Sequence, residues 1–144
     1  MAEAATAKDV LEKLSRMLPS SEPEAREVYR IGDLAREFDV SLRTLRFYED
    51  RGLIQPTRAG STRLYSHDDR QRLKIILLIK SLGFSLIDIE KMLKLYDSDD
   101  SASGLDTILE KFSEQLQSLQ DQKVDIDQRI ADLQNASRQI RDMI

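Results

Sequence analysis

The stretch YRIGDLAREFDVSLRTLRFYEDRG, from Tyr29 to Gly52, decides the fold of this chain. Apolar residues first recur there at the i, i+3, i+4 and i+7 spacing of a helix; they are Ile31, Leu34, Ala35 and Phe38. Asp39 and Val40 form a turn, and Ser41 is a suitable N-cap for a second helix that Gly52 ends. The stretch therefore predicts a helix-turn-helix, although many helical hairpins share this pattern.

The surface of the second helix suggests what it binds. Its apolar positions, Leu42, Leu45 and then Tyr48 or Glu49, follow at helical spacing. Polar and basic side chains lie off this stripe, together with Phe47; they are Arg43, Thr44, Arg46 and Arg51. Arginine at the start of such a helix can bind guanine in the major groove, and arginine, threonine and tyrosine further along can reach phosphates. The alternative is a solvated charged face with no binding role.

A small β-hairpin is expected directly after this helix pair. Two short extended pieces, within Leu53–Tyr65, flank Ala59-Gly60-Ser61. Arg58 and Arg63 bracket the tip of this hairpin. A basic hairpin beside a helix-turn-helix is a wing, which can grip the sugar-phosphate backbone of DNA.

Three further helices are expected after the wing. Ser66 and Ser85 are N-caps for the first two, and residues 98–104 form an acidic, serine-rich hinge before the third. From residue 105 to 144, apolar residues step by +4 and +3 over more than five heptads; they include Leu105, Leu109, Phe112, Leu116, Leu119, Ile126 and Ile130. A single exposed helix cannot bury such a seam, so we expect a dimerising coiled coil. Packing within the chain is the alternative.

Residues 1–28 precede this architecture. Val10, Leu11, Leu14, Met17 and Leu18 share one helical face, and Pro19 ends that helix. We expect a partly ordered extension here. The alternative is a short amphipathic helix that docks on the body of the protein or on a partner.

Composition narrows the function. The net charge is −4, but residues 29–83 carry +4, residues 84–144 carry −6 and residues 1–28 carry −2. Nucleic-acid binding depends on such a local basic region.

The 144 residues include no cysteine and one histidine, His67, which leaves no pair of residues for a metal or a nucleophile. The carboxylate pairs Asp68-Asp69 and Asp99-Asp100 are better explained as a helix cap and a solvated hinge. We therefore expect no enzyme, no metal and no cofactor. No signal peptide or membrane span is recognisable either, which indicates a cytoplasmic protein.

The motifs together resemble the MerR family of bacterial transcription regulators. The resemblance is carried by IGDLA, RTLRFYEDRGLI, TRLYS and IILLIKSLGFSLIDI between Tyr29 and Tyr96, and more loosely by the coil. It implies a mainly α fold, with a winged helix-turn-helix over residues 29–97 and a dimerisation helix over residues 105–144. It implies a homodimer joined by an antiparallel coiled coil, bound to a pseudo-palindromic promoter. Such regulators bend and untwist double-stranded DNA so that RNA polymerase can engage the promoter.

The resemblance also assigns roles to residues. Arg43 and Arg46 match groove-facing positions, Tyr48 a phosphate contact, and Arg63 and Tyr65 wing contacts, with Arg58 nearby. Two further backbone contacts are expected, from Ser41 and Thr44. The main alternative is a coiled-coil interaction module whose helix-turn-helix binds protein.

Departures from the family pattern bear on regulation. Without cysteines, sensing of metal ions by thiolates and redox sensing by iron–sulfur clusters are excluded, and no large effector domain is expected after the coil. The chain is most similar to short, cysteine-free regulators of branched-chain amino acid and acyl-CoA catabolism, which leaves room for a small-molecule effector.

Overall fold

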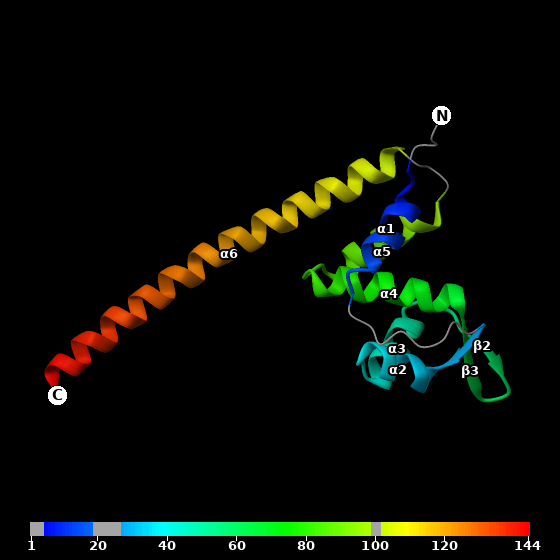
Figure 1. The fold of residues 1–144 in the computed structure, drawn as a ribbon, viewed down its shortest axis with the longest axis horizontal. Coiled ribbons are helices and arrows are strands. Elements are labelled where there is room, and N and C mark those ends of the chain that lie inside the picture. The colour runs from blue at the N-terminus through cyan, green and yellow to red at the C-terminus, as the bar shows by residue number, and fades with distance from the viewer. Residues whose placement is uncertain (1–4, 19–26, 99–101) are drawn as a thin grey trace. The chain divides into compact units, whose positions relative to one another are not determined.

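The computed structural model describes residues 5–18, 27–98 and 102–144. The chain divides into two compact units, Met1–Leu105 and Asp106–Ile144. Helices dominate, and the three short strands form one sheet (Figure 1). The elements are α1 (Ala7–Ser15), β1 (Val28–Arg30), α2 (Ile31–Phe38), α3 (Leu42–Asp50), β2 (Thr57–Ala59), β3 (Thr62–Ser66), α4 (His67–Ser81), α5 (Leu86–Asp97) and α6 (Ala102–Met143). None of the described helices is long and apolar enough to cross a membrane.

The predicted helix-turn-helix is confirmed as α2 and α3. Asp39 ends α2 in a left-handed conformation (φ 52°), which aspartate tolerates better than most residues. Ser41 then caps α3, and its hydroxyl accepts a hydrogen bond from the Thr44 amide at 3.0 Å. Gly52 follows α3 with a positive φ of 73°, as expected of a helix-ending glycine.

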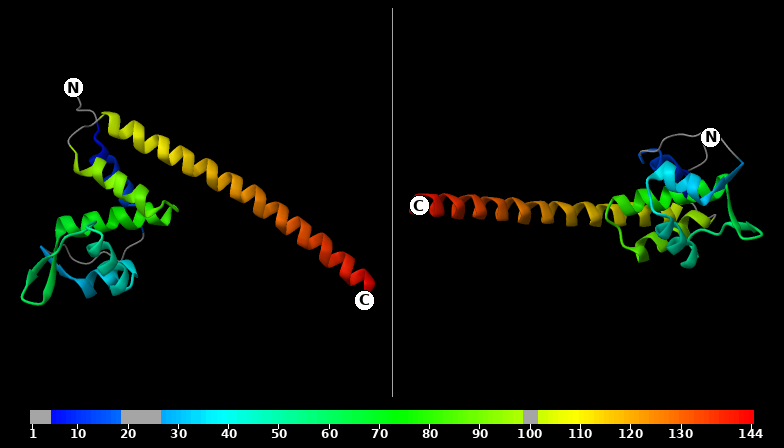
Figure 2. Two further views of the ribbon diagram at one scale, coloured as in Figure 1. Left: turned by 180° about the vertical axis from the view of Figure 1, so that it is seen from behind. Right: turned by 90° about the horizontal axis from the view of Figure 1, so that it is seen from below.

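The wing is confirmed as the β2–β3 hairpin, which extends beyond the helices of its unit (Figure 2). Arg58 lies opposite Arg63 in the antiparallel register. The sheet also contains a strand that the sequence analysis missed. β1 pairs with the other side of β3, with Tyr29 opposite Tyr65, so the strand order is β1-β3-β2. This strand joins the wing to the start of the helix-turn-helix.

The core of the first unit is centred on α4. Its residues Ile75 to Ile79 are all buried, as expected of a helix surrounded by other elements. Ser66 and Ser85 cap α4 and α5 as predicted. His67 is an exposed residue in the first turn of α4, and Asp69 completes a capping box with Ser66.

A buried ion pair joins α2 to α4. The Arg70 guanidinium donates from Nε to both carboxylate oxygens of Glu37, at 2.9 and 3.0 Å. The side chains of Glu37 and Arg70 are 3% and 11% exposed. Arg70 also lies over the rings of Tyr29 and Phe38. The helix-turn-helix is therefore attached to α4 by a charge-assisted contact as well as by apolar packing.

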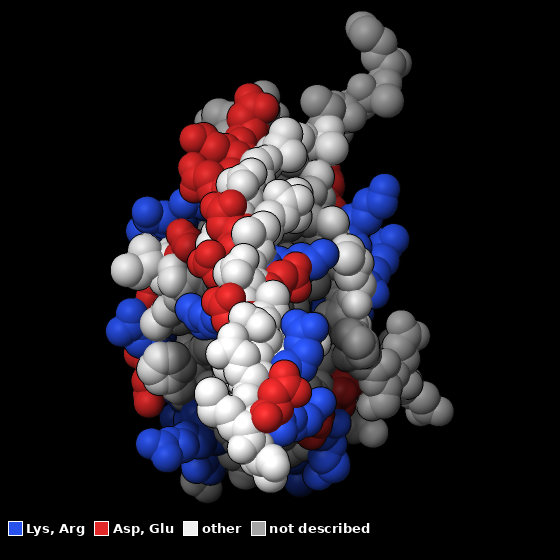
Figure 3. Space-filling view, turned by 90° about the vertical axis from the view of Figure 1, so that its left-hand side faces the viewer, with Lys and Arg blue, Asp and Glu red and all other residues white. Residues whose placement is uncertain are grey.

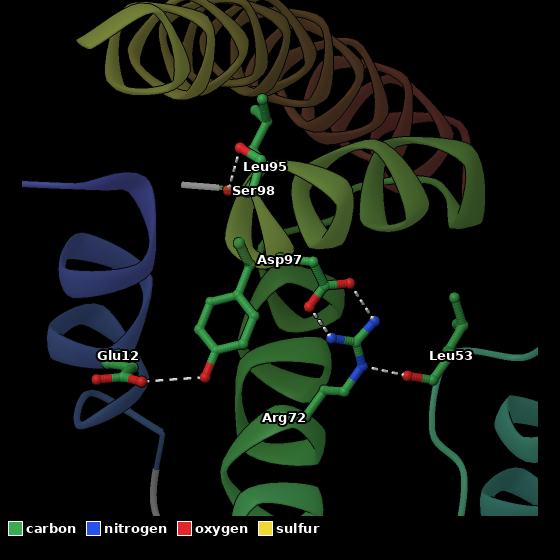
Figure 4. Close-up of polar contacts among 7 residues, drawn as sticks. Glu12, Leu53, Arg72, Leu95, Asp97 and Ser98 are labelled. Carbon is green, nitrogen blue, oxygen red and sulfur yellow. Dashed lines mark hydrogen bonds and ion pairs between the residues drawn. The ribbon is translucent and has the colours of Figure 1, made fainter. Parts of the chain in front are cut away.

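Residues 7–15, within the extension that was expected to be partly ordered, are helical. They form α1, which packs against α4 and α5 with Leu11 and Ala7 buried. The Tyr96 hydroxyl donates to the Glu12 carboxylate at 3.0 Å, and Glu12 is labelled in Figure 4. The Gln71 amide donates to the Ser15 hydroxyl at 2.9 Å. The docked amphipathic helix, which was the alternative, is what the structure contains.

Part of the expected hinge belongs to α6. This helix begins at Ala102, so residues 102–104 are helical, while residues 99–101, with the Asp99-Asp100 pair, lie outside the described residues. A β-carbon built on Gly104 would lie 3.2 Å from the β-carbon of Ala7 and 3.8 Å from Leu95. Glycine at this position allows α1 to pack closely against the start of α6.

Candidate nucleic-acid interface

The interface is built around α3. Ser41 and Thr44, two of the predicted DNA contacts, lie at the start of this helix, and their hydroxyl oxygens are 2.8 Å apart. Ser41 is exposed and Thr44 half-buried. Both are engaged in capping the helix, so their first role is to set where α3 begins. A contact to the DNA backbone stays a prediction for both.

Arg43 and Arg46 differ from most arginines of the first unit. Both are exposed on α3, and neither has an ion pair or a side-chain hydrogen bond within the described part of the chain. By contrast, Arg51 at the end of the same helix pairs with Glu90 at 3.1 Å. The charges of Arg43 and Arg46 are therefore not neutralised by a carboxylate in the described part of the chain. Such charges are suited to phosphates and base edges.

The wing arginines are held by a carboxylate of α3. Arg63 donates from Nε to Glu49 at 2.6 Å, and Arg58 donates to the other Glu49 oxygen at 3.1 Å. Burial acts to raise the pKa of Glu49, but the hydrogen bonds from Arg63 and Arg58 outweigh it and lower this pKa below its ordinary value of 4.5. One carboxylate thus attaches both wing strands to α3. The predicted DNA contacts of Arg58 and Arg63 stay predictions.

Tyr48 and Tyr65 lie in the core, contrary to the surface role expected for them. Their exposed fractions are 2% and 0%. Their hydroxyl groups are buried and have no hydrogen-bond partner among the described residues. Burial is also the main cause that raises the pKa of Tyr65. A phosphate cannot reach either hydroxyl in this conformation, so the structure does not support a DNA contact by these tyrosines.

A cleft of about 500 Å³ opens between α2, α3 and the wing. Four arginines line it, Arg30, Arg36, Arg46 and Arg63, together with the single acidic residue Asp33. The sequence analysis did not single out Arg30 and Arg36. Their only signal was the positive charge of residues 29–83, because their proximity to Arg46 and the wing depends on the fold. The cleft is basic and has the character of a phosphate-binding surface.

The second unit is a single helix with an exposed apolar row. At ~1.5 Å per residue, the 42 residues of α6 span about 63 Å. In the space-filling view of Figure 3, a stripe of uncharged residues, drawn in white, has charged residues on both sides. Five of the seven predicted dimerisation residues are exposed in the single chain, and Leu105 and Phe112 are half-buried. The exposed five are Leu109, Leu116, Leu119, Ile126 and Ile130.

Comparison with known proteins identifies the family. A family model described as MerR HTH family regulatory protein matches residues 29–95, and one described as MerR, DNA binding, matches residues 70–143. The HTH-type transcriptional regulator ZntR of Escherichia coli K12 is 32% identical over 116 residues, which cover 79% of this chain and 77% of ZntR. The chain belongs to the MerR family. Neither match to the MerR models includes α1.

Two solved structures extend the comparison of this MerR protein. A MerR-family transcriptional regulator from Bacillus cereus has a TM-score of 0.62 and 27% identity, over 72% of this chain and 75% of that one. HiNmlR, described as a MerR family regulator lacking the sensor domain, bound to promoter DNA, has a TM-score of 0.57 and 25% identity, over 72% and 78%. The fold class inferred from the sequence is confirmed, and the transcription-regulator class is shown.

Proposed function

We propose that this MerR protein regulates transcription by binding promoter DNA through α3 and the wing. The observation that carries the proposal is the pair of exposed arginines on α3, Arg43 and Arg46, for which the described structure contains no carboxylate partner. Arg46 also lines the basic cleft. We assign base recognition to Arg43 and Arg46, and backbone contacts to Arg58 and Arg63. HiNmlR, a structural neighbour, is described as bound to promoter DNA, which supports this assignment.

The proposed assembly is a homodimer joined by an antiparallel coiled coil of two α6 helices. The exposed apolar row of α6 supports it, because a helix that leaves such a row in water gains stability by pairing. A two-fold dimer places two copies of α3 on a pseudo-palindromic operator. We further propose that the dimer bends and untwists this DNA, so that RNA polymerase can engage the promoter.

The test is DNA binding by the intact chain, measured by fluorescence anisotropy on the promoter region of its own gene. Arg43→Ala should weaken binding to the operator by ~1–3 kcal/mol if Arg43 reads a base. Arg63→Ala should weaken binding to all sequences and reduce the dependence of affinity on salt. Lys94→Ala, which removes an exposed charge from α5, is the matched control and should have no effect.

Two results would contradict these roles. If Arg43→Ala leaves operator affinity unchanged, Arg43 does not read a base. If the salt dependence of Arg63→Ala equals that of the parent protein, Arg63 does not bind a phosphate. If the parent protein shifts no promoter DNA at any salt concentration but forms complexes with other proteins, the interaction-module alternative holds instead.

The regulated pathway is a separate proposal. The resemblance to regulators of branched-chain amino acid and acyl-CoA catabolism concerns residues 36–54 and 62–97 and does not follow from the DNA-binding geometry. Acyl-CoA dehydrogenase genes beside the gene for this chain would support the subgroup. An inverted repeat inside an overlong promoter spacer would support the distortion mechanism.

A further inference from the structure

A second hollow lies on the other flank of α3, away from the wing. This open pocket, of about 350 Å³, is bounded by α3, the end of α4, the α4–α5 connection and the start of α5. All of its residues belong to the first compact unit. The lining residues are Arg43, Thr44, Phe47, Tyr48, Lys80, Phe84, Leu86 and Ile89.

The walls combine apolar surface with positive charge. The apolar lining residues include Phe47, Phe84, Leu86 and Ile89. The charged groups are Arg43 and Lys80, and neither forms an ion pair within the described part of the chain. The ammonium group of Lys80 lies 5.8 Å from the centre of the Tyr48 ring. No acidic residue lines the pocket. Such a site favours a ligand that has an apolar body and a negative charge.

Tyr48 also lines the pocket. Its hydroxyl is buried and has no hydrogen-bond partner among the residues that the structure describes. A buried hydroxyl without a partner is destabilising. Because this hydroxyl is buried, a ligand in the pocket contacts other atoms of Tyr48 and not the hydroxyl.

We propose that this pocket binds a small aliphatic or aromatic carboxylate. The carboxylate group lies between Arg43 and Lys80, and the apolar body packs against Phe84 and Ile89. The volume is near the lower end of the range for small-molecule pockets. The ligand is therefore a compact acid rather than a whole acyl-CoA.

Arg43 connects this pocket to DNA binding. It lines the pocket and is also the residue proposed to read a base. A carboxylate that binds Arg43 withdraws this charge from DNA, so ligand and operator should compete. This regulatory consequence rests on the proposed function, but binding of the acid in the absence of DNA does not.

The test uses the intact protein with phenylacetate, and with phenylacetamide as a neutral probe of nearly the same shape. Isothermal titration calorimetry without DNA should show that phenylacetate binds about tenfold more tightly than phenylacetamide, because only the acid pairs with the cations. Lys80→Gln should weaken phenylacetate binding about tenfold by the same argument. Leu86→Trp should abolish binding by filling the pocket. Lys94→Gln, on the same helix as Leu86 but outside the lining, is the control.

Lys80→Gln and Leu86→Trp proteins should keep the unfolding cooperativity of the parent protein, and operator binding measured without acid serves as a second check on folding. Equal affinity for phenylacetate and phenylacetamide would overturn the proposal, as would phenylacetate binding that survives both substitutions. If the parent protein binds phenylacetate but does not bind the operator, the proposed function is refuted and the ligand site is not. Saturating phenylacetate should weaken operator binding of the parent protein, and no change would refute the competition.

Discussion

The buried pair Glu37–Arg70 provides the sharpest test of how the helix-turn-helix is held. We consider Glu37→Met, Arg70→Met and the double variant, because methionine fills similar space without charge. Removal of Arg70 takes the guanidinium from the Glu37 carboxylate, and removal of Glu37 takes this carboxylate from Arg70, in a site where the two side chains are 3% and 11% exposed. Removal of both leaves no unpaired charge. The single and double variants should therefore behave very differently.

The expected magnitudes follow from this burial. Breaking a buried pair by removing one partner costs about 3–5 kcal/mol, whereas replacing both partners with apolar residues is often close to neutral. Each single variant should thus lose a large part of the ~5–15 kcal/mol that stabilises a typical domain. The double variant should be more stable than either single variant. Arg70 also lies 5.8 and 5.7 Å from the centres of the Tyr29 and Phe38 rings, so Arg70→Met should cost at least as much as Glu37→Met.

The assay is urea unfolding of the intact chain, followed by circular dichroism at a fixed protein concentration because the proposed dimerisation would contribute to stability. A double-mutant cycle then gives the interaction free energy of the two side chains. Operator binding should be lost in parallel with stability in the single variants, since α2 supports α3. If each single variant costs under about 1 kcal/mol, or if the two single effects simply add in the double variant, the pair does not hold α2 on α4.

Further expectations concern α1, the wing and α6. Leu11→Ala should destabilise the fold by about 2–5 kcal/mol because Leu11 is fully buried, whereas Met17→Ala, at a 68% exposed position, should cost almost nothing in the same urea experiment. The Glu49 carboxylate, paired with the wing arginines, stabilises the wing at pH values above its unfolded pKa near 4.5. This stabilisation is lost as the pH falls through the lower pKa that Glu49 has in the folded protein. Amide resonances of the wing should follow this titration in the parent protein but not in Glu49→Gln. Leu116→Glu should produce monomers in sedimentation experiments, while Gln117→Glu, off the apolar row, should not.

Local signals in the sequence were sufficient for much of the fold. Ser41, Ser66 and Ser85 each precede a helix, and the structure confirms all three as caps. A cap needs only its own residue and the next three, so it can be recognised without knowledge of the tertiary structure. The hairpin and the long helix were also predictable, since a turn and a heptad repeat are local patterns.

Features that depend on distant partners could not be predicted in this way. β1 has only three residues and is defined by its pairing with β3. The docking of α1 depends on Gln71 and Tyr96, which lie far along the chain. Tyr48 shows a different kind of error. Its helical spacing from Leu45 placed it on the apolar stripe, but the family motif assigned it to DNA. The periodicity agrees with the observed burial, whereas the motif by itself could not distinguish a core tyrosine from a surface one.

The pairing of arginines explains why net charge is a poor guide to the interface. Residues 29–83 carry +4, yet many of their cations are neutralised within the fold. The arginines that pair with carboxylates are Arg36, Arg51, Arg58, Arg63, Arg70 and Arg72. The last of these donates to both Asp97 and the Leu53 carbonyl (Figure 4). A paired cation gives up favourable contacts before it can bind a phosphate, whereas an exposed and unpaired one loses only water. Arg43 and Arg46 should therefore dominate the response to DNA, and Arg43, at the edge of the apolar pocket, is where a small acid would interfere most directly.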